Sequence, residues 1–88
     1  MKAQVRLISK LLNQEPKKNG TQAWNWLGTT HSGKKLSLYY DEHHLFGHGD
    51  FVEVYDSQNV TGLNPAPRCD DVVSFPIRDI PKHFKRAE

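Results

Sequence analysis

Two β-prone runs separated by a short polar loop give the clearest structural signal in this sequence. Residues 21–29 and 34–40 are rich in Thr, Trp, Leu and Tyr, and the tripeptide His31-Ser32-Gly33 lies between them. Runs of this composition, joined by a short segment that contains glycine, are typical of a β-hairpin. The sequence therefore predicts an antiparallel pair of strands in this part of the chain.

The two faces of this hairpin follow from the length of its loop. A loop of two or four residues pairs odd positions of one strand with even positions of the other, and side chains alternate between the faces. With either length, one face is largely aliphatic and is the natural core: Ala23, Leu27, Leu36, Leu38 and Tyr40. The other face then carries Trp24, Trp26, Lys35 and Tyr39. We therefore expect a solvent-facing surface of aromatic rings and lysines.

The N-terminal segment can be interpreted in two ways. Residues 2–11 alternate between polar and apolar side chains, as on a half-buried strand. The same segment also carries a stripe at helical spacing, formed by Val5, Ile8, Leu11 and Leu12. We prefer the strand because a helix here would lack an N-cap residue. The polar stretch that follows, residues 13–20, is predicted to be a loop that closes with an Asn-Gly turn.

Further strands are expected at residues 51–55 and 72–75, the second at a sheet edge because Pro76 cannot donate to a ladder. The stretch between them contains Gly and Pro and is predicted to be irregular. Four or five short strands with irregular connections indicate a mainly β fold, a small single-domain barrel or bent antiparallel sheet, OB-like or SH3-like. Residues 1–80 are assigned to this domain and residues 81–88 to a basic C-terminal tail.

Length and composition exclude several classes of protein. Eighty-eight residues support one small core. The single cysteine, Cys69, allows neither an intramolecular disulfide nor a zinc ribbon. No apolar run approaches the roughly 20 residues of a membrane span, and the first residues lead into no signal-peptide core. We therefore expect a cytoplasmic protein without a membrane partner.

Charge is unevenly distributed along the chain. Residues 1–40 contain seven Lys or Arg and one Glu, a net charge of +6, whereas residues 41–67 contain five Asp or Glu and no Lys or Arg, a net charge of −5. Residues 68–88 contribute +1. Such segregation predicts a basic face for a polyanion, an acidic face for a basic partner, or charges that meet and neutralise each other in the fold.

No segment carries a catalytic or cofactor-binding signature. The GxSxG elbow, the GxxxxGK[ST] loop and the GxGxxG loop are all absent. His43, His44 and His48 form a cluster that could bind a metal if this stretch were helical. Gly47 and Gly49, within and beside the cluster, oppose a helix there. Cys69 has no base that the sequence places beside it. We expect no enzyme activity, no cofactor and no bound metal.

The leading hypothesis is a non-enzymatic module that binds single-stranded DNA or RNA with little sequence preference. Aromatic rings stack on bases in such modules, and lysines neutralise the phosphates. Trp24, Trp26 and Tyr39 are the predicted stacking residues. The phosphate contacts are assigned to Lys17, Lys18, Lys34 and Lys35, with the segment 81–86 as a supporting contact.

The alternative hypothesis is a small protein-binding inhibitor or adaptor of the kind that phages and other mobile elements encode. Its working surface would be the acidic stretch 41–56, which would bind a basic patch on a larger host protein through charge complementarity. The Trp-rich face could also be covered by a second part of the core or by a second copy of the chain. A homodimer is compatible with both hypotheses.

Overall fold

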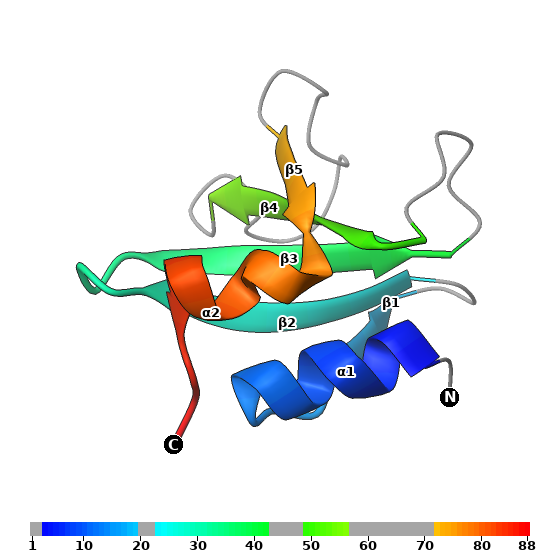
Figure 1. Ribbon diagram of the computed structural model, residues 1–88, viewed down its shortest axis with the longest axis horizontal. Coiled ribbons are helices and arrows are strands. Elements are labelled where there is room, and N and C mark those ends of the chain that lie inside the picture. The colour runs from blue at the N-terminus through cyan, green and yellow to red at the C-terminus, as the bar shows by residue number, and fades with distance from the viewer. Residues whose placement is uncertain (1–2, 20–22, 43–48, 57–71) are drawn as a thin grey trace.

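The computed structural model of the protein describes residues 3–19, 23–42, 49–56 and 72–88 (Figure 1). Its helical elements are α1 (Ala3–Leu12), the 3-10 turn η2 (Ile77–Asp79) and α2 (Ile80–His83). Its strands are β1 (Lys17–Asn19), β2 (Ala23–Thr30), β3 (Lys35–Asp41), β4 (Phe51–Asp56), β5 (Val72–Pro76) and β6 (Phe84–Lys85).

The strands form one antiparallel sheet with the order β1-β2-β3-β4-β5, and β6 pairs with β2. Within the described residues β1 and β5 do not pair with each other, so the sheet is open and bent rather than closed (Figure 1). The prediction of a mainly β fold with a small bent antiparallel sheet is confirmed. The strand that precedes Pro76 is also found at the edge of the sheet, as expected.

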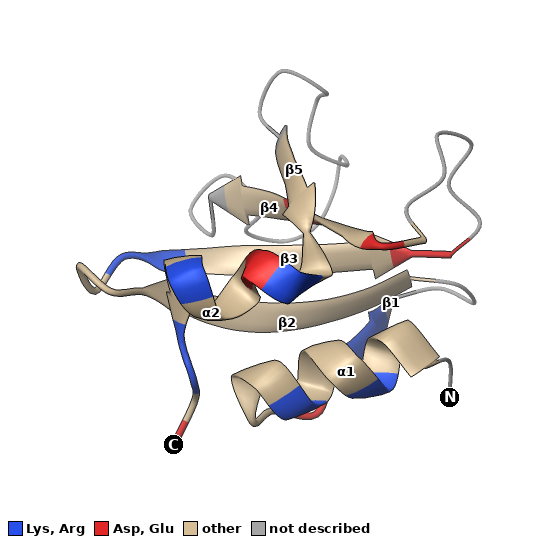
Figure 2. Cartoon of the chain, in the orientation of Figure 1, with Lys and Arg blue, Asp and Glu red and all other residues tan. Residues whose placement is uncertain are grey.

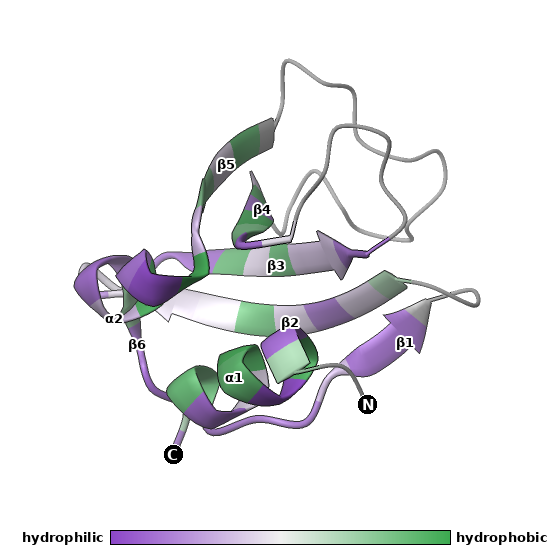
Figure 3. Cartoon of the chain, turned by 45° about the vertical axis from the view of Figure 1, so that its right-hand side comes forward, coloured by the Kyte–Doolittle hydropathy of each residue, from purple (hydrophilic) through white to green (hydrophobic). Residues whose placement is uncertain are grey.

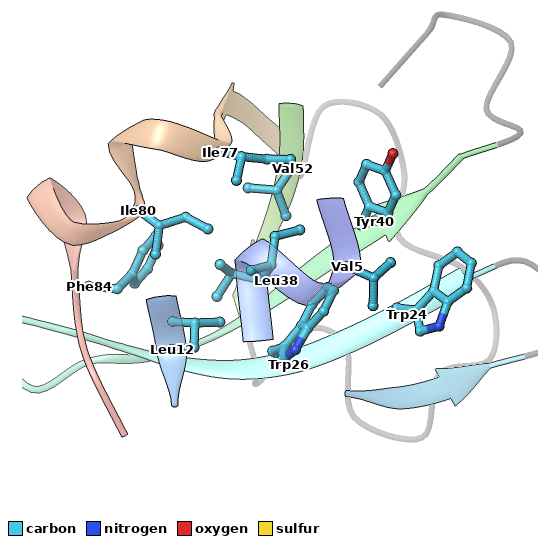
Figure 4. Close-up of a cluster of buried hydrophobic side chains, with 11 residues drawn as sticks. Val5, Leu12, Trp24, Trp26, Leu38, Tyr40, Val52, Ile77, Ile80 and Phe84 are labelled. Carbon is cyan, nitrogen blue, oxygen red and sulfur yellow. The ribbon is translucent and has the colours of Figure 1, made fainter. Parts of the chain in front are cut away.

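The hydrophobic core lies on one face of the sheet, between the sheet and the helical elements (Figure 4). It combines side chains from α1, from the central strands and from the segment 77–84. Its buried members are Val5, Ile8, Leu12, Trp24, Trp26, Leu38, Tyr40, Val52, Ile77, Ile80 and Phe84. None of the described helices is long and apolar enough to cross a membrane.

The N-terminal segment is a helix, so the preferred strand interpretation was wrong. Val5, Ile8 and Leu12 recur every three to four residues and are all buried, with at most 1% of their surface exposed. The alternation instead required Leu7 to point inward, and Leu7 is 45% exposed. Packing of the helical stripe on the sheet therefore outweighs the missing N-cap.

The C-terminal end of α1 is closed by a Schellman motif. Asn13 has φ 52°, the left-handed conformation that stops a helix. The Gln14 N–H donates to the Ser9 carbonyl at 3.0 Å, and the Asn13 N–H donates to the Lys10 carbonyl at 3.3 Å. These bonds satisfy carbonyls that a helix end otherwise leaves unpaired. They also turn the chain back toward the sheet, where β1 begins.

The hairpin between β2 and β3 has a three-residue loop, not a loop of two or four residues. The Thr30 N–H donates to the Lys34 carbonyl at 2.8 Å, and the Gly33 N–H donates to the Thr30 carbonyl at 2.9 Å. Gly33 has φ 95°, which a side chain would oppose. An odd loop length pairs positions of the same parity, for example Trp26 with Leu38. Every side chain of one strand is therefore shifted to the face opposite to the predicted one.

The predicted loop and the predicted tail each contribute a short strand to the sheet. Residues 17–19 pair with residues 23–25 of β2 as the short strand β1. The segment 81–88 packs against the domain: Phe84 is 5% exposed, and the Ala87 N–H donates to the Leu12 carbonyl at 2.7 Å. The C-terminal segment is therefore attached to the end of α1 and contributes to the core.

A glutamine side chain closes the gap between β1 and β6 on the same edge of β2. β1 pairs with residues 23–25, and β6 pairs with residues 29 and 30. Between them, the Leu27 N–H donates to Gln14 Oε1 at 2.8 Å. An unpaired strand edge invites pairing with another chain, and here the edge of β2 is covered by backbone and by one side-chain amide.

Candidate nucleic-acid interface

The two tryptophans lie inside the protein. Trp24 is 8% exposed and Trp26 is 2% exposed, and both rings belong to the core cluster (Figure 4). Trp26 Nε1 donates to Ser9 Oγ at 3.1 Å, which joins β2 to α1 and satisfies the polar atom of the ring. The predicted exposed face with Trp24, Trp26, Lys35 and Tyr39 is therefore not formed, because the three-residue loop turns the tryptophans inward.

Trp24 lies at the margin of this core. Its ring centroid is 6.2 Å from that of Tyr40, and Lys18 Nζ lies 5.0 Å from the centroid of the indole. A cation over an indole face is attracted by the electron density of the ring. Lys18 thus packs against the Trp24 ring while the residue remains exposed to solvent.

The remaining predicted binding residues are divided among three places. Lys17, Lys35 and Tyr39 lie on the outer face of the sheet, opposite to α1. Lys34 lies at the hairpin turn, where its N–H donates to Thr30 Oγ1 at 2.9 Å. Lys18 lies on the side of α1, next to Trp24. The structure therefore does not bring the seven predicted residues together as one surface.

Tyr39 belongs to a small polar cluster of its own. Its ring packs edge-on against Tyr55 at 5.6 Å, and its hydroxyl donates to Asp41 Oδ2 at 3.3 Å. The Tyr55 hydroxyl in turn donates to Glu53 Oε2 at 2.6 Å. The two carboxylates beside Tyr39 would repel a phosphate, so this ring is poorly placed to stack on a nucleic-acid base.

Three neighbouring hollows lie along α1 and along the segment that joins α1 to β1. The first lies between residues 14–18 and the strands β2 and β3, and the second lies along α1 from Arg6 to Glu15. The third lies between α1 and the C-terminal segment, beside His31. The first and second share Gln14 and Glu15, and the second and third share Lys10. We call these three hollows together the α1 groove. The first opens partly on the outer face of the sheet, where Asn25 and Leu27 lie, and the other two lie along α1.

The α1 groove is strongly basic. Six Lys or Arg side chains line it: Arg6, Lys10, Lys17, Lys18, Lys85 and Arg86. Its lining contains two carboxylates, Glu15 and Glu88. Figure 2 shows the same distribution on the ribbon, with Lys and Arg on β1, α1 and the C-terminal segment. β1, at one end of the groove, is hydrophilic (Figure 3).

Comparisons of this chain with protein-family models, with curated proteins and with solved structures found no match.

Sequence reasoning did not select several residues that shape the groove. Gln14 falls in the predicted loop 13–20, and Asn25 falls in the first predicted strand of the hairpin. Both residues line the first hollow. Leu27 was assigned to the core, yet it is 46% exposed and borders the same hollow. A three-residue loop in the predicted hairpin would have placed Asn25 and Leu27 on its outward face.

The acidic stretch is only partly a surface. Glu53 is 8% exposed and accepts the Tyr55 hydroxyl, so it is not available to a partner. Asp41, Glu42 and Asp50 lie near Tyr40, at the end of β3 and just before β4, and none of them is in the described lining of the α1 groove.

The residues considered for metal binding and thiol chemistry fall outside the described residues: His43, His44, His48 and Cys69. In the parts of the chain that the structure describes, no three His, Cys, Asp or Glu side chains gather as metal ligands would.

The two tyrosines of β3 predict an alkaline limit of stability. Burial, followed by the nearby carboxylates, raises the pKa of Tyr39 and of Tyr40 above the usual value of 10.0. The folded protein therefore retains these phenolic protons at a pH at which the unfolded chain loses them. Their contribution to the free energy of unfolding should be constant below pH 10 and should decline as the pH rises further. Urea titrations from pH 8 upward, with tyrosinate absorbance as a second signal, would measure this decline. A stability that rises above pH 10 would contradict it.

Proposed function

We propose that this protein binds single-stranded nucleic acid, DNA or RNA, through the α1 groove, as a binding module rather than an enzyme. The observation that carries the proposal is the excess of cationic side chains in three neighbouring hollows, whose described lining contains six Lys or Arg and two carboxylates. A polyanion that neutralises several Lys or Arg residues releases its bound counterions, and this release drives association. A linear, flexible polyanion can follow basic hollows that lie one after another from the edge of the sheet along α1.

Two exposed leucines favour a single strand over a duplex. Leu7 borders the third hollow and is 45% exposed, and Leu27 borders the first and is 46% exposed. Unpaired bases present flat apolar faces that can cover such side chains, whereas a duplex hides its bases in the stack. The apolar parts of the groove thus complement a strand whose bases are free.

The buried tryptophans change the expected character of the binding. Base stacking on exposed aromatic rings contributes roughly 1–3 kcal/mol per base in single-strand binding proteins. Trp24 and Trp26 are too deeply buried to supply this contribution. Affinity would then come mainly from phosphate contacts, with a steep dependence on salt and little preference for base sequence.

Removal of two groove lysines should weaken binding specifically. We expect Lys17→Gln/Lys18→Gln to lose roughly tenfold or more in affinity for a labelled oligothymidylate, because two charge-assisted contacts are lost. The slope of log K against log salt should fall by about 1.4, since each phosphate contact on a single strand contributes about 0.7. Fluorescence polarisation at several salt concentrations, with a blunt duplex in parallel, would measure both quantities.

The matched control is Lys34→Gln/Lys35→Gln, which removes the same charge at the hairpin turn, outside the groove. We expect this variant to retain nearly all of its affinity. Equal losses in the two double variants would mean that net charge, not the groove, determines binding. Failure of the wild-type protein to bind at low salt would contradict the proposed function.

The protein-binding alternative has weaker support. Its acidic surface loses Glu53 to the interior. Asp41, Glu42 and Asp50 would have to provide the attraction to a basic partner. This alternative becomes the better proposal if no polyanion binds.

A further inference from the structure

The first hollow of the α1 groove contains a buried hydrogen-bond donor without an acceptor. Asn25 Nδ2 is buried and has no hydrogen-bond partner among the residues that the structure describes. Leaving a buried donor unpaired costs roughly 1–3 kcal/mol, and such groups are rare in native proteins. Asn25 also lines this hollow, which has a volume of about 580 Å³, within the range of ligand pockets. If the Asn25 side chain turned slightly toward the hollow, an acceptor oxygen of a ligand would satisfy the donor.

Other donors surround Asn25. Lys17 and Tyr39 are its cross-strand partners on the outer face of the sheet, and Ser37 also lines the hollow. The Tyr39 hydroxyl donates to Asp41, and neither of these two residues is in the described lining of the hollow. Gln14 accepts the Leu27 N–H through Oε1, so its amide NH₂ remains as a donor group at the wall. Among the lining residues of this hollow, one carboxylate, Glu15, opposes two lysines. The lining is therefore rich in donors and net positive.

We infer that this hollow is a phosphate subsite, in which Asn25 Nδ2 donates to a phosphate oxygen and Lys17 supplies the neutralising charge. Phosphate has several strong acceptor oxygens and matches a site of amide donors and ammonium groups. Leu27 offers an apolar surface for the sugar or base attached to that phosphate. The inference rests on the proposed function in one respect, namely that the phosphate belongs to a bound strand.

Nuclear magnetic resonance of the side-chain amides would test the subsite directly. Inorganic phosphate would be titrated into ¹⁵N-labelled protein against sodium chloride at matched ionic strength. The Asn25 NH₂ signals, identified by their absence in Asn25→Ala, should shift in a saturable manner with phosphate and with oligothymidylate. Oligonucleotides with and without a 5′-phosphate would distinguish a terminal phosphate from one within the strand.

Two variants separate binding from folding. Asn25→Ala should bind oligothymidylate roughly tenfold less tightly, equivalent to the loss of one hydrogen bond to a charged group. Its melting temperature should not fall, because the variant removes an unsatisfied donor. The control Thr29→Ala changes another outward position of β2 that does not line the hollow, and it should leave affinity unchanged.

The outcomes separate the subsite from the function. If the oligonucleotide binds but the Asn25 signals stay fixed and Asn25→Ala binds normally, the subsite is overturned and the groove proposal stands. If phosphate shifts the Asn25 signals but no oligonucleotide binds, the subsite is supported as a site for a free phosphate compound, and the proposed function is overturned. A melting temperature of Asn25→Ala well below that of the wild type would show that Asn25 is structural and would also overturn the subsite.

Discussion

Replacement of Trp26 with alanine should strongly destabilise the folded protein. The indole is 2% exposed, packs among the core side chains of α1 and the sheet, and donates to Ser9 Oγ (Figure 4). Truncation of a buried tryptophan costs about 3–5 kcal/mol, whereas the whole free energy of unfolding of a typical domain is about 5–15 kcal/mol. Circular dichroism during a urea titration would show a midpoint shifted strongly to lower urea, or no folded baseline at all.

The adjacent residue provides the matched control. Leu27 is 46% exposed on the opposite face of β2, and Leu27→Ala should change the free energy of unfolding by no more than about 0.5 kcal/mol. This pair of variants decides between the two assignments of the hairpin faces. If Leu27→Ala unfolded the protein and Trp26→Ala did not, the even positions of β2 would be the exposed ones and the stacking surface would be restored.

Gly28→Val should cause the next largest loss of stability. Gly28 lies on the core face of β2, and a Cβ atom there would overlap Leu38 Cδ1 and lie 3.2 Å from Phe84 Cδ1. Leu38 is fully buried, so it has little room to move. Overpacking of a core costs about 1–3 kcal/mol, and in a domain of this size each kcal/mol lowers the melting temperature by about 4–8 °C. Thermal melting should therefore show a decrease of roughly 10–20 °C.

Gly49→Ala is the control for this prediction. Among the described residues, no heavy atom lies within 4 Å of a Cβ placed at Gly49, and this residue is not among the glycines with positive φ. Its melting temperature should remain within about 2 °C of the wild type, as expected for a surface change. Equal sensitivity at the two positions would mean that glycine flexibility, not the space beside Leu38 and Phe84, determines stability.

Strands β2 to β5 were predictable from composition, whereas β1 and β6 were not, and the assignment of the hairpin faces depended on a single residue of loop length. The hairpin, the strand at 51–56 and the edge strand before Pro76 all follow from β-prone runs and turn residues. The faces do not, because one additional loop residue exchanges them. The last position of the loop did carry a clue, since a glycine just before the second strand is typical of a three-residue loop with a left-handed residue.

The N-terminal helix shows the limit of a local argument. Alternation and helical periodicity were both present in ten residues, and the absence of an N-cap decided the preference. The sequence also carries a helix-stop signal at the C-terminal end of this segment. Asn13 follows two leucines, and asparagine is one of the few residues that adopt the left-handed conformation readily. A helix stop at that position would have favoured the helical stripe.

The site is less predictable than the fold because it is assembled from distant segments. Arg86 Nη2 donates to Asn13 Oδ1 at 3.4 Å, and these two residues are 73 positions apart in the chain. Such contacts bring Lys85 and Arg86 beside Lys10, and no spacing rule in the sequence indicates them. The uneven distribution of charge did predict a basic surface in general terms. The location of that surface depended on how α1 packs against the sheet.

The position of β6 has a consequence for the order in which the protein can fold. Residues 84 and 85 complete the edge of β2, and Phe84 closes the core above Gly28. The ends of this contact are separated by more than half of the chain, and the loop entropy must be lost before Phe84 gains its burial. A nascent chain emerging from the ribosome can therefore form the β2–β3 hairpin early, but its core stays incomplete until Phe84 has been synthesised.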